Sequence, residues 1–312
     1  MMPANLRTYT ELMARREELD AVGVTRSGSL LDRNVCLDFS RASSRGGVIL
    51  AEITLGFGSS VEIVDLPLDG RPWQWVQTST PNGIDTLSMQ MAGTFVTPGG
   101  KWRGCASGPF RLAAFKEKLF QQLRVEIDDS PTWVVVLESA RAPDDDVFNF
   151  IREQATGMPP ERVVICLAPV NCVAGAVQVA ARCAECAMHT WKHHGWPLPP
   201  SFRVEGLAPI APAVDDEMEM MARTNEAILE AGSVTVEVEG VAQDVLVRNA
   251  PQLCFSGLFP GRTFRNLLDE AGHFNKLPEL AFAPSHITLI GGGLPVECGH
   301  ANESALSAAW SL

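Results

Sequence analysis

The chain has 312 residues, 46% of them hydrophobic, which is enough for one large domain or two ordinary domains with a sizeable core. Its 25 basic and 37 acidic residues give a formal net charge of -12, and such a field repels phosphate polymers and anionic membrane surfaces. The charge therefore argues against a nucleic-acid partner.

The cysteines and the N-terminus indicate where such a protein resides. Eight cysteines are spread along the chain without the dense spacing of a disulfide-stapled secreted domain, so reduced thiols are expected. Residues 1–23 place charges among their apolar residues, unlike a signal peptide. No segment approaches the roughly 18 to 20 apolar residues that span a bilayer. We therefore expect a cytoplasmic protein that does not enter a membrane.

Hydrophobic patterning predicts alternating strands and helices in the first part of the chain. A helix is expected from Thr10 to Gly23, and residues 46–58 have an ambiguous period that allows a helix. Further strands are expected at 34–39, 61–68, 73–80, 132–139 and 161–169, and further helices at 108–123, 143–156 and the alanine-rich segment from 173. Strand, helix, strand and helix in succession are typical of a layered α/β unit.

A proline-rich stretch at 196–214 is interpreted as the main connection between two lobes, because prolines are rare in helices and central strands. The predicted domains are therefore 1–195 and 196–312. The second lobe is expected to contain a helix at 215–232, a hairpin at 233–247, a helix at 264–272, a hairpin at 286–298 and a helix at 304–312. Two glycine-containing segments, 56–60 and 98–102, lack the spacing of phosphate loops, so nucleotide binding has no support.

The segment QVAARCAECAMHTWKHHG, from residue 178, concentrates chemically active side chains. On a continuous helix with 100° steps, five of them fall within a stripe about 80° wide. These are Gln178, Arg182, Glu185, His189 and Lys192. Six alanines between 174 and 187 allow neighbours to approach closely, which implies a buried helix with one polar face. Such a face lines a cavity or forms a salt bridge.

Three interpretations of this segment remain open on the residues alone. Cys183 and Cys186 are suitable zinc ligands, but one rigid helix hardly supplies four ligands around a tetrahedron, so two small buried thiols are favoured and no metal is expected. Arg182 and Glu185, three residues apart, are equally compatible with a structural ion pair. If the pair is buried, its desolvation favours a functional role.

Six ordered runs resemble a known family, and they cover nearly the whole chain from about residue 36. They are GGVILAEITLG, CASGPFRLAA, VVLESARAPDD, ICLAPVNCVAGAVQVAARCAE, GLAPIAPAVDDEMEMMARTNEAI and FAPSHITL. The chain resembles the methenyltetrahydromethanopterin cyclohydrolases of methanogenic archaea and methylotrophic bacteria. Residues 41–46, 251–280 and the glycine hairpin near 290 depart from the archaeal pattern, as in a divergent bacterial member.

The resemblance implies reversible hydrolysis of the methenyl bridge between N5 and N10 of methenyl-tetrahydromethanopterin, giving the N5-formyl carrier in one-carbon metabolism. It implies a two-lobed α/β fold with the substrate in a cleft between the lobes, a homotrimer, and no metal, nucleotide or other cofactor. The alternative is a non-catalytic pterin-binding paralogue or a subunit of another one-carbon enzyme. The presence of both Arg182 and Glu185 argues against that alternative.

The resemblance also assigns residues. The family's acid/base pair matches Arg182 and Glu185: Glu185 would take a proton from the attacking water and return it to N10, and Arg182 would orient the carboxylate. We expect the lowering of the carboxylate's pKa by Arg182 to be offset by burial. The matching candidates for substrate binding are Ser107, Gly108, Glu138, Ser139, Asn171, Gln178, Thr224 and Asn225. For these eight, a structural cap or turn role is the alternative.

Overall fold

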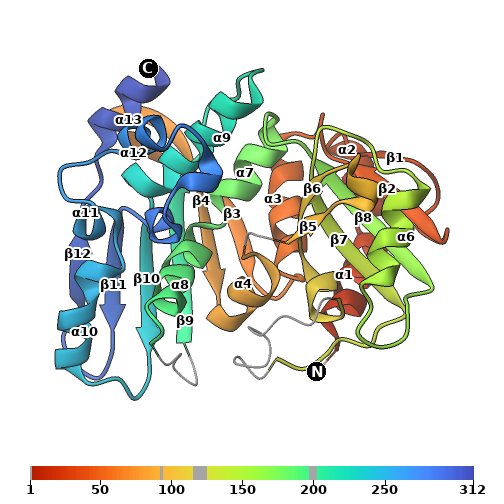
Figure 1. Cartoon of the computed structure of the whole chain (residues 1–312), viewed down its shortest axis with the longest axis horizontal. Coiled ribbons are helices and arrows are strands. Elements are labelled where there is room, and N and C mark those ends of the chain that lie inside the picture. The colour runs from red at the N-terminus through yellow and green to blue at the C-terminus, as the bar shows by residue number, and fades with distance from the viewer. Residues whose placement is uncertain (1, 92–93, 115–124, 197–201) are drawn as a thin grey trace. The chain divides into compact units, whose positions relative to one another are not determined.

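A computed structural model describes residues 2–91, 94–114, 125–196 and 202–312. The described chain separates into two compact units, each with its own six-stranded sheet (Figure 1). Unit 1 comprises Met1–Ser60 and Ile84–Gln178, and unit 2 comprises Val61–Gly83 and Val179–Leu312. This confirms the predicted α/β class. The chain passes between the units near residues 60, 83 and 178, whereas the sequence placed a boundary at 195.

The sheet of unit 1 has the order β1-β2-β8-β7-β6-β5, with a parallel core of β2, β8 and β7. Continuous apolar runs form the central strands, because both of their faces are covered. The strands are β1 (Thr25–Arg26), β2 (Asn34–Asp38), β5 (Phe95–Val96), β6 (Gly104–Ser107), β7 (Thr132–Glu138) and β8 (Arg162–Ala168). The predicted strands at 34–39, 132–139 and 161–169 are thereby confirmed.

Helices cover both faces of this sheet. On β7, Val134 and Val136 pack into one apolar core, while Val135 and Leu137 pack into another, as the two-residue period of a strand requires. The helical segments are α1 (Ala4–Ala14), α2 (Arg16–Ala21), α3 (Ser44–Thr54), α4 (Gly83–Met89), η1 (Pro98–Gly100), η2 (Pro109–Leu112), α6 (Asp145–Glu153) and α7 (Val173–Ala180). The ambiguous segment at 46–58 is therefore largely helical.

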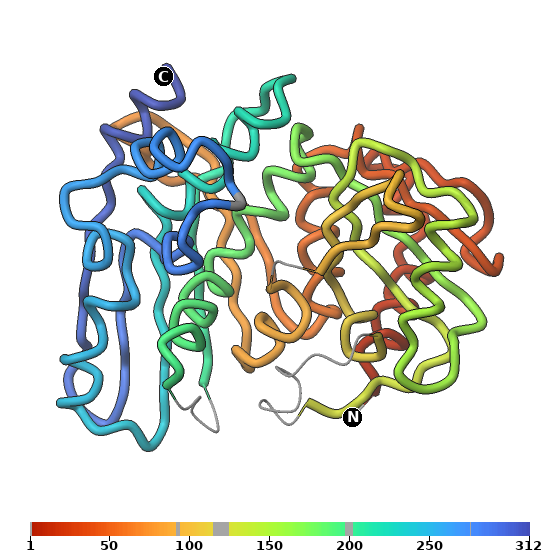
Figure 2. Tube along the Cα trace, in the orientation of Figure 1, coloured from red at the N-terminus to blue at the C-terminus, as the bar shows by residue number. Residues whose placement is uncertain are grey.

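The sheet of unit 2 has the order β12-β11-β10-β9-β4-β3. Its strands are β3 (Ser60–Leu68), β4 (Arg71–Thr80), β9 (Phe202–Pro209), β10 (Ser233–Val238), β11 (His286–Ile290) and β12 (Val296–Gly299). Figure 2 follows the β3–β4 hairpin, drawn in orange, to its place beside the later strands of the sheet. Asp69 and Gly70 turn this hairpin with positive φ at both residues, the geometry of a tight primed turn.

The remaining helical segments of unit 2 join and cover its strands. They are α8 (Cys183–His193), α9 (Glu217–Glu226), the π-helix η3 (Ala227–Ala231), α10 (Gln243–Asn249), η4 (Ala250–Gln252), α11 (Phe255–Leu258), α12 (Phe264–Ala271), η5 (Phe274–Lys276), η6 (Glu279–Phe282) and α13 (Glu303–Trp310). The helices predicted at 215–232, 264–272 and 304–312 and the hairpin at 286–298 are confirmed in outline. Among the helices described, none is both long and apolar enough to cross a membrane.

Four sequence predictions differ from the structure, and a fifth lies largely outside the described residues. The helix expected from Thr10 begins at Ala4, and the segment from 173 is broken between Ala180 and Cys183. The connection expected at 196–214 contains β9, an interior strand whose proline is its last residue. The second strand of the hairpin expected at 233–247 is instead α10. Of the helix expected at 108–123, the structure describes only the short η2 and its flanks, since 115–124 lie outside the described residues.

Helix α8 lies very close to the sheet of unit 2. Gly206 on β9 has no side chain, and a Cβ atom there would lie 2.6 Å from the backbone nitrogen of Ala184. Because that neighbour is backbone, it cannot rotate away. Gly206 is thus the position that permits the close approach of α8.

We expect Gly206→Ala to lower the free energy of unfolding by about 1 to 3 kcal/mol, since the added methyl group overpacks the helix–sheet contact. Gly292→Ala is the matched control, because a Cβ there meets nothing within 4 Å, and its effect should stay within about 0.5 kcal/mol. Urea denaturation measures both. Equal stabilities of the two variants would contradict the proposed close approach.

Candidate active site

Arg182 and Glu185 lie at the start of α8. Arg182 is the N-cap residue with φ -82° and ψ 0°, and its carbonyl accepts the backbone N–H of Cys186 at 3.1 Å. Glu185 lies in the first helical turn and is only 6% exposed. A carboxylate in this position is stabilised by the positive end of the helix dipole. The two predicted catalytic residues therefore share one helical turn, and the carboxylate is buried.

Tertiary contacts hold this helix start. The hydroxyl of Thr78 on β4 donates to the carbonyl of Ala181 at 3.2 Å, and the Arg182 N–H donates to the carbonyl of Val179 at 2.9 Å. Cys183 contacts the carbonyls of Leu207 and Ser233 through Sγ at 3.6 and 3.7 Å. These bonds satisfy backbone groups at the break between α7 and α8 and fix the direction in which α8 begins.

The polar stripe predicted on one continuous helix is divided by this break. Gln178 lies on α7 in unit 1, and it is buried with 4% exposure. Glu185, His189 and Lys192 remain on α8 at helical spacing. The pKa of His189 is lowered to about 3, mainly by burial, with the charges of His193 and Lys192 contributing in the same direction. His189 is therefore neutral at pH 7, and it lies one turn beyond Glu185 along the helix.

Cys183 and Cys186 are both buried, as the thiol interpretation predicted. Burial raises the pKa of Cys183 to about 12, opposed by its bond to Leu207, and burial also raises the pKa of Cys186. Protonated thiols are poor metal ligands, because zinc binds the thiolate. Within the described ranges, no group of three or more His, Cys, Asp and Glu side chains is arranged for a metal ion.

Three predicted binding residues of unit 1 follow the carboxyl ends of parallel strands. Glu138 ends β7 opposite Ala168, the last residue of β8, and Asn171 lies in the loop after β8. Ser139 follows Glu138, and its hydroxyl donates to the carbonyl of Arg103 at 3.2 Å. This edge of a parallel sheet is where α/β proteins bind ligands. The structure therefore gathers these three residues at a suitable place.

Sequence reasoning missed Asp38 at the same edge. Asp38 ends β2 opposite Leu167, and its carboxylate accepts the Ser40 N–H at 2.8 Å. Burial is the main cause of the raised pKa of the Cys172 thiol, and the charges of Asp38 and Glu138 add to it. The charges of two carboxylates thus disfavour ionisation of the same thiol. The signal in the sequence was an aspartate at the end of a buried strand, in the position that Glu138 occupies on β7.

Ser107 is the last residue of the neighbouring strand β6, and Gly108 follows it as the N-cap of η2. Ser107 pairs with Val136 of β7 and is buried. Gly108 has φ +100°, a conformation that favours glycine, and its N–H donates to the carbonyl of Met89 at 2.8 Å. The backbone donor of Gly108 that the sequence offered to a ligand is therefore already used within unit 1.

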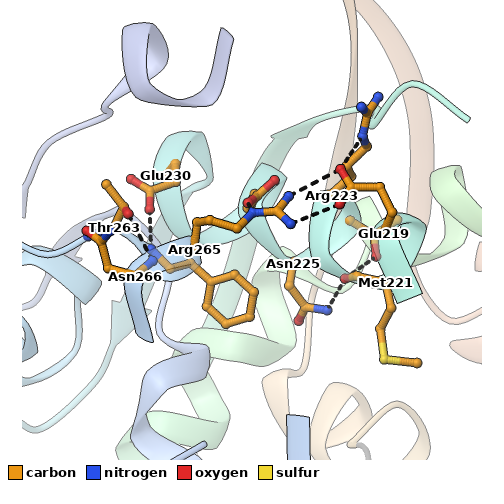
Figure 3. A network of polar contacts seen from close by, with 11 residues as sticks. Glu219, Met221, Arg223, Asn225, Glu230, Thr263, Arg265 and Asn266 are labelled. Carbon is orange, nitrogen blue, oxygen red and sulfur yellow. Dashed lines mark hydrogen bonds and ion pairs between the residues drawn. The ribbon is translucent and has the colours of Figure 1, made fainter. Parts of the chain in front are cut away.

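Thr224 and Asn225 lie on α9 in unit 2, and both bond to their own helix. The Thr224 hydroxyl donates to the carbonyl of Met221 at 3.1 Å. The Asn225 amide donates to the same carbonyl at 2.8 Å (Figure 3). Beside them, Arg265 of α12 bonds Glu226 at 2.6 Å and Glu219 at 2.9 Å. These ion pairs hold α9 against α12.

Unit 2 also contains a cavity of about 180 Å³ that sequence reasoning did not identify. Its wall includes Glu230, which belongs to the π-helix η3 and accepts the Phe264 N–H at 2.6 Å through its carboxylate. Burial raises the pKa of Glu230 to about 7, and the charge of Glu226 contributes in the same direction. π-Helical turns occur frequently at functional positions. Phe255, Ser256 and His300 line the same cavity.

Fold and site together define a two-unit α/β protein with an arginine and a glutamate at the start of a helix packed on its second sheet. The chain belongs to the family described as Cyclohydrolase (MCH), whose profile matches residues 10–310. Three relatives are named methenyltetrahydromethanopterin cyclohydrolase. One from Methanosarcina barkeri is 30% identical over 78% of this chain and 76% of its own. One from Methanococcus maripaludis is 28% identical over 92% of this chain and 90% of its own. One from Methylobacterium sp. is 36% identical over 64% of this chain and 62% of its own.

The raised pKa of Glu230 predicts a specific pH dependence of stability. Between the ordinary glutamate pKa near 4.5 and about 7, the unfolded chain loses this proton while the folded chain keeps it, so stability falls as the pH rises. From pH 5 to pH 8 the free energy of unfolding of the wild type should fall by roughly 2 kcal/mol more than that of Glu230→Gln. Urea denaturation at both pH values measures this. The exposed Glu237→Gln should follow the wild type, and parallel curves for Glu230→Gln and the wild type would contradict the prediction.

Proposed function

We propose that the protein catalyses the reversible hydrolysis of the methenyl bridge of methenyl-tetrahydromethanopterin to the N5-formyl carrier, in one-carbon metabolism. The observation that carries the proposal is the pair Arg182 and Glu185 on one turn of α8, in a chain that matches the cyclohydrolase family over residues 10–310. The names of the related proteins supply the substrate.

The chemistry needs little more than a positioned water and a group that moves a proton. The bridging carbon of the amidinium carries delocalised positive charge, so water adds to it readily once a base accepts a proton. The resulting hydroxyl adduct then loses its second proton as the carbonyl forms and the bond from carbon to N10 breaks. N10 takes up one proton as it leaves, so the net reaction releases one proton to solvent.

Glu185 is assigned as the group that accepts the proton of the attacking water and returns it to N10. Its burial limits competing hydration, and its place in the first turn of α8 orients it within a rigid element. Arg182 is assigned to orient the Glu185 carboxylate through charge-assisted hydrogen bonds. Its positive charge is also assigned to offset the effect of burial, which favours the protonated form of the Glu185 carboxylate. An arginine suits this role because its guanidinium is planar and remains charged.

Glu138 is assigned to bind the amino-pyrimidinone ring of the pterin, because a carboxylate accepts two adjacent N–H groups of such a ring. Ser139 and Asn171, at the same sheet edge, are assigned to further polar contacts with the pterin. Asp38 is assigned to the same role because it ends β2 at that edge. The other assigned contacts, which rest on the family resemblance, are Ser107, Gly108, Gln178, Thr224 and Asn225. For Thr224 and Asn225, a contact with substrate would add to or replace their bonds to Met221.

The remaining properties are proposed on the same resemblance. We propose a homotrimer that uses no metal or other cofactor and treats tetrahydromethanopterin as its carrier substrate. The charge of -12 and the reduced state of the eight cysteines support a cytoplasmic location without nucleic-acid or membrane partners.

We expect Glu185→Gln to lower kcat by at least about 100-fold, because the amide cannot accept the proton of the attacking water. Arg182→Lys should cause a smaller loss and shift the acid limb of the rate–pH profile, because lysine keeps the charge but not the planar donor fork. The decrease in near-ultraviolet absorbance of the methenyl pterin measures both rates. Glu237→Gln is the control, because Glu237 is exposed on β10, and this variant should retain the wild-type rate.

Near wild-type rates in both Glu185→Gln and Arg182→Lys would contradict the assignment of the pair. Binding of the methenyl pterin by wild-type protein without loss of its absorbance would instead favour the non-catalytic paralogue. Equilibrium binding measured beside turnover separates these two results.

We expect Glu138→Gln to raise KM at least about tenfold with a smaller change in kcat, because it replaces one acceptor oxygen by a donor and loses a charge-assisted hydrogen bond. Steady-state kinetics with the methenyl pterin as substrate measure KM and kcat separately. Glu153→Gln, at an exposed position at the end of α6, is the control and should change neither constant. A loss confined to kcat would show that Glu138 does not serve ground-state binding.

A further inference from the structure

Two cysteines of unit 2 lie against each other, although 44 residues separate them in the chain. Cys254 caps the N-terminus of α11, and Cys298 lies on the edge strand β12. Their Sγ atoms are 3.5 Å apart, in contact as free thiols. A disulfide bond requires about 2.05 Å between the sulfurs, so a small rotation of the side chains suffices to form one.

The backbone on both sides holds the two cysteines in this position. Hydrogen bonds fix each partner: the Phe255 N–H donates to the carbonyl of Pro284 at 2.8 Å, and β12 pairs with β11 through Cys298 and Ile287. Gly299 permits the approach, because a Cβ there would lie 3.0 Å from the Cβ of Cys254 and 2.2 Å from the carbonyl of Ser285. The contact is therefore a consequence of the fold around it and of a glycine beside it.

The two thiols differ in access to solvent. Cys298 is partly exposed on the edge strand, whereas Cys254 is buried. Burial raises the pKa of Cys254 to about 11, so at neutral pH this thiol is protonated and does not react first with an oxidant. A small oxidant in solution meets Cys298, and the sulfur of Cys254 is already within contact distance.

We propose that Cys254 and Cys298 form a redox modification site, at which a peroxide converts the two thiols to a reversible disulfide. The Cys298 thiol loses its proton, the thiolate attacks one peroxide oxygen and the O–O bond breaks, which makes Cys298 a sulfenic acid. The hydroxide that leaves takes up the proton that the thiol lost and becomes water. Cys254 then attacks the sulfenic sulfur, the S–S bond forms, and the hydroxyl group leaves as a second water with the proton of Cys254. Two thiols and one hydrogen peroxide thus give one disulfide and two waters.

The disulfide would join α11 to β12 beside the cavity of unit 2. Phe255 and Ser256, which follow Cys254, and His300, two residues after Cys298, line that cavity with Glu230. The hydroxyl of Ser285 donates to the carbonyls of Glu230 and His300 at 3.0 and 2.6 Å, and so links the same wall. Oxidation would therefore restrict the wall from which Glu230 projects. It does not involve Arg182 or Glu185, so the inference is independent of the proposed function.

Peptide mapping of the full-length protein tests the proposal. The protein is treated with hydrogen peroxide, its remaining thiols are blocked with N-ethylmaleimide before unfolding, and it is digested with trypsin. Cleavage after Arg248, Arg262 and Lys276 gives peptides 249–262 and 277–312, each with a single cysteine. We expect these two peptides to be joined, two hydrogens lighter than their sum, and to separate after treatment with dithiothreitol.

Two variants provide the matched comparison. Cys298→Ser should abolish the joined peptide, whereas Cys105→Ser, which removes the other partly exposed cysteine, should retain it. Oxidation should raise the Tm of the wild type and of Cys105→Ser by several degrees, because the link closes a long loop in the unfolded chain, and should leave Cys298→Ser unchanged. Recovery of both wild-type peptides unlinked and alkylated, or of Cys298 as sulfinic acid without the link, would overturn the proposal.

Discussion

The close contact of α8 with the second sheet is the constraint on which the candidate active site depends. Gly206 leaves no side chain between β9 and the backbone of Ala184, so the helix rests directly on the strand. Thr78 on the adjacent β4 bonds the carbonyl of Ala181 at the helix break. Arg182 and Glu185 follow within one turn. Their positions are therefore fixed by backbone packing and not by contacts of their own side chains alone.

Burial dominates the electrostatics of two ionisable groups in unit 2, His189 and Glu230. It lowers the pKa of His189 to about 3 and raises the pKa of Glu230 to about 7, in each case more than any neighbouring charge does. Both groups thereby favour their neutral forms, because a charge loses much of its hydration inside a packed protein. Glu226 is partly relieved of this cost by Arg265, which bonds its carboxylate at 2.6 Å. Glu185 adds a buried carboxylate to this set, placed where a helix dipole favours its charge.

The residues assigned to chemistry and to pterin binding have different kinds of support from the fold. Glu138 and Asp38 end parallel strands of the first sheet, and their position follows from the rule that such strands direct their carboxyl ends to one edge. Arg182 and Glu185 depend on a helix break that no general rule supplies. Thr224 and Asn225 are already bonded to the carbonyl of Met221, so their assigned contacts would add to or replace bonds within α9.

Local patterning predicted those elements whose burial matches their own sequence. The runs at β7 and β8 are apolar throughout, because both of their faces are covered, and α6 has an aspartate cap that bonds Val147. Prediction failed where distant partners decide the structure. The prolines near β9 suggested a linker, yet residues 204–207 of this strand pair with β4 on one side and with β10 on the other. Residues 243–247 were predicted as the second strand of a hairpin, but Leu246 and Ala250 are buried four residues apart, which is the spacing of a helix.

The α/β class, the family and an arginine and a glutamate three residues apart are all evident from the amino-acid sequence, because these properties reside in composition, order and local spacing. Long-range packing, in contrast, breaks the alanine-rich segment at Ala181, places the hairpin at 60–80 in the second sheet, and brings Cys254 against Cys298. Each of these depends on the close approach of segments far apart in the chain. Such an approach is set by packing and backbone hydrogen bonds that no local pattern contains.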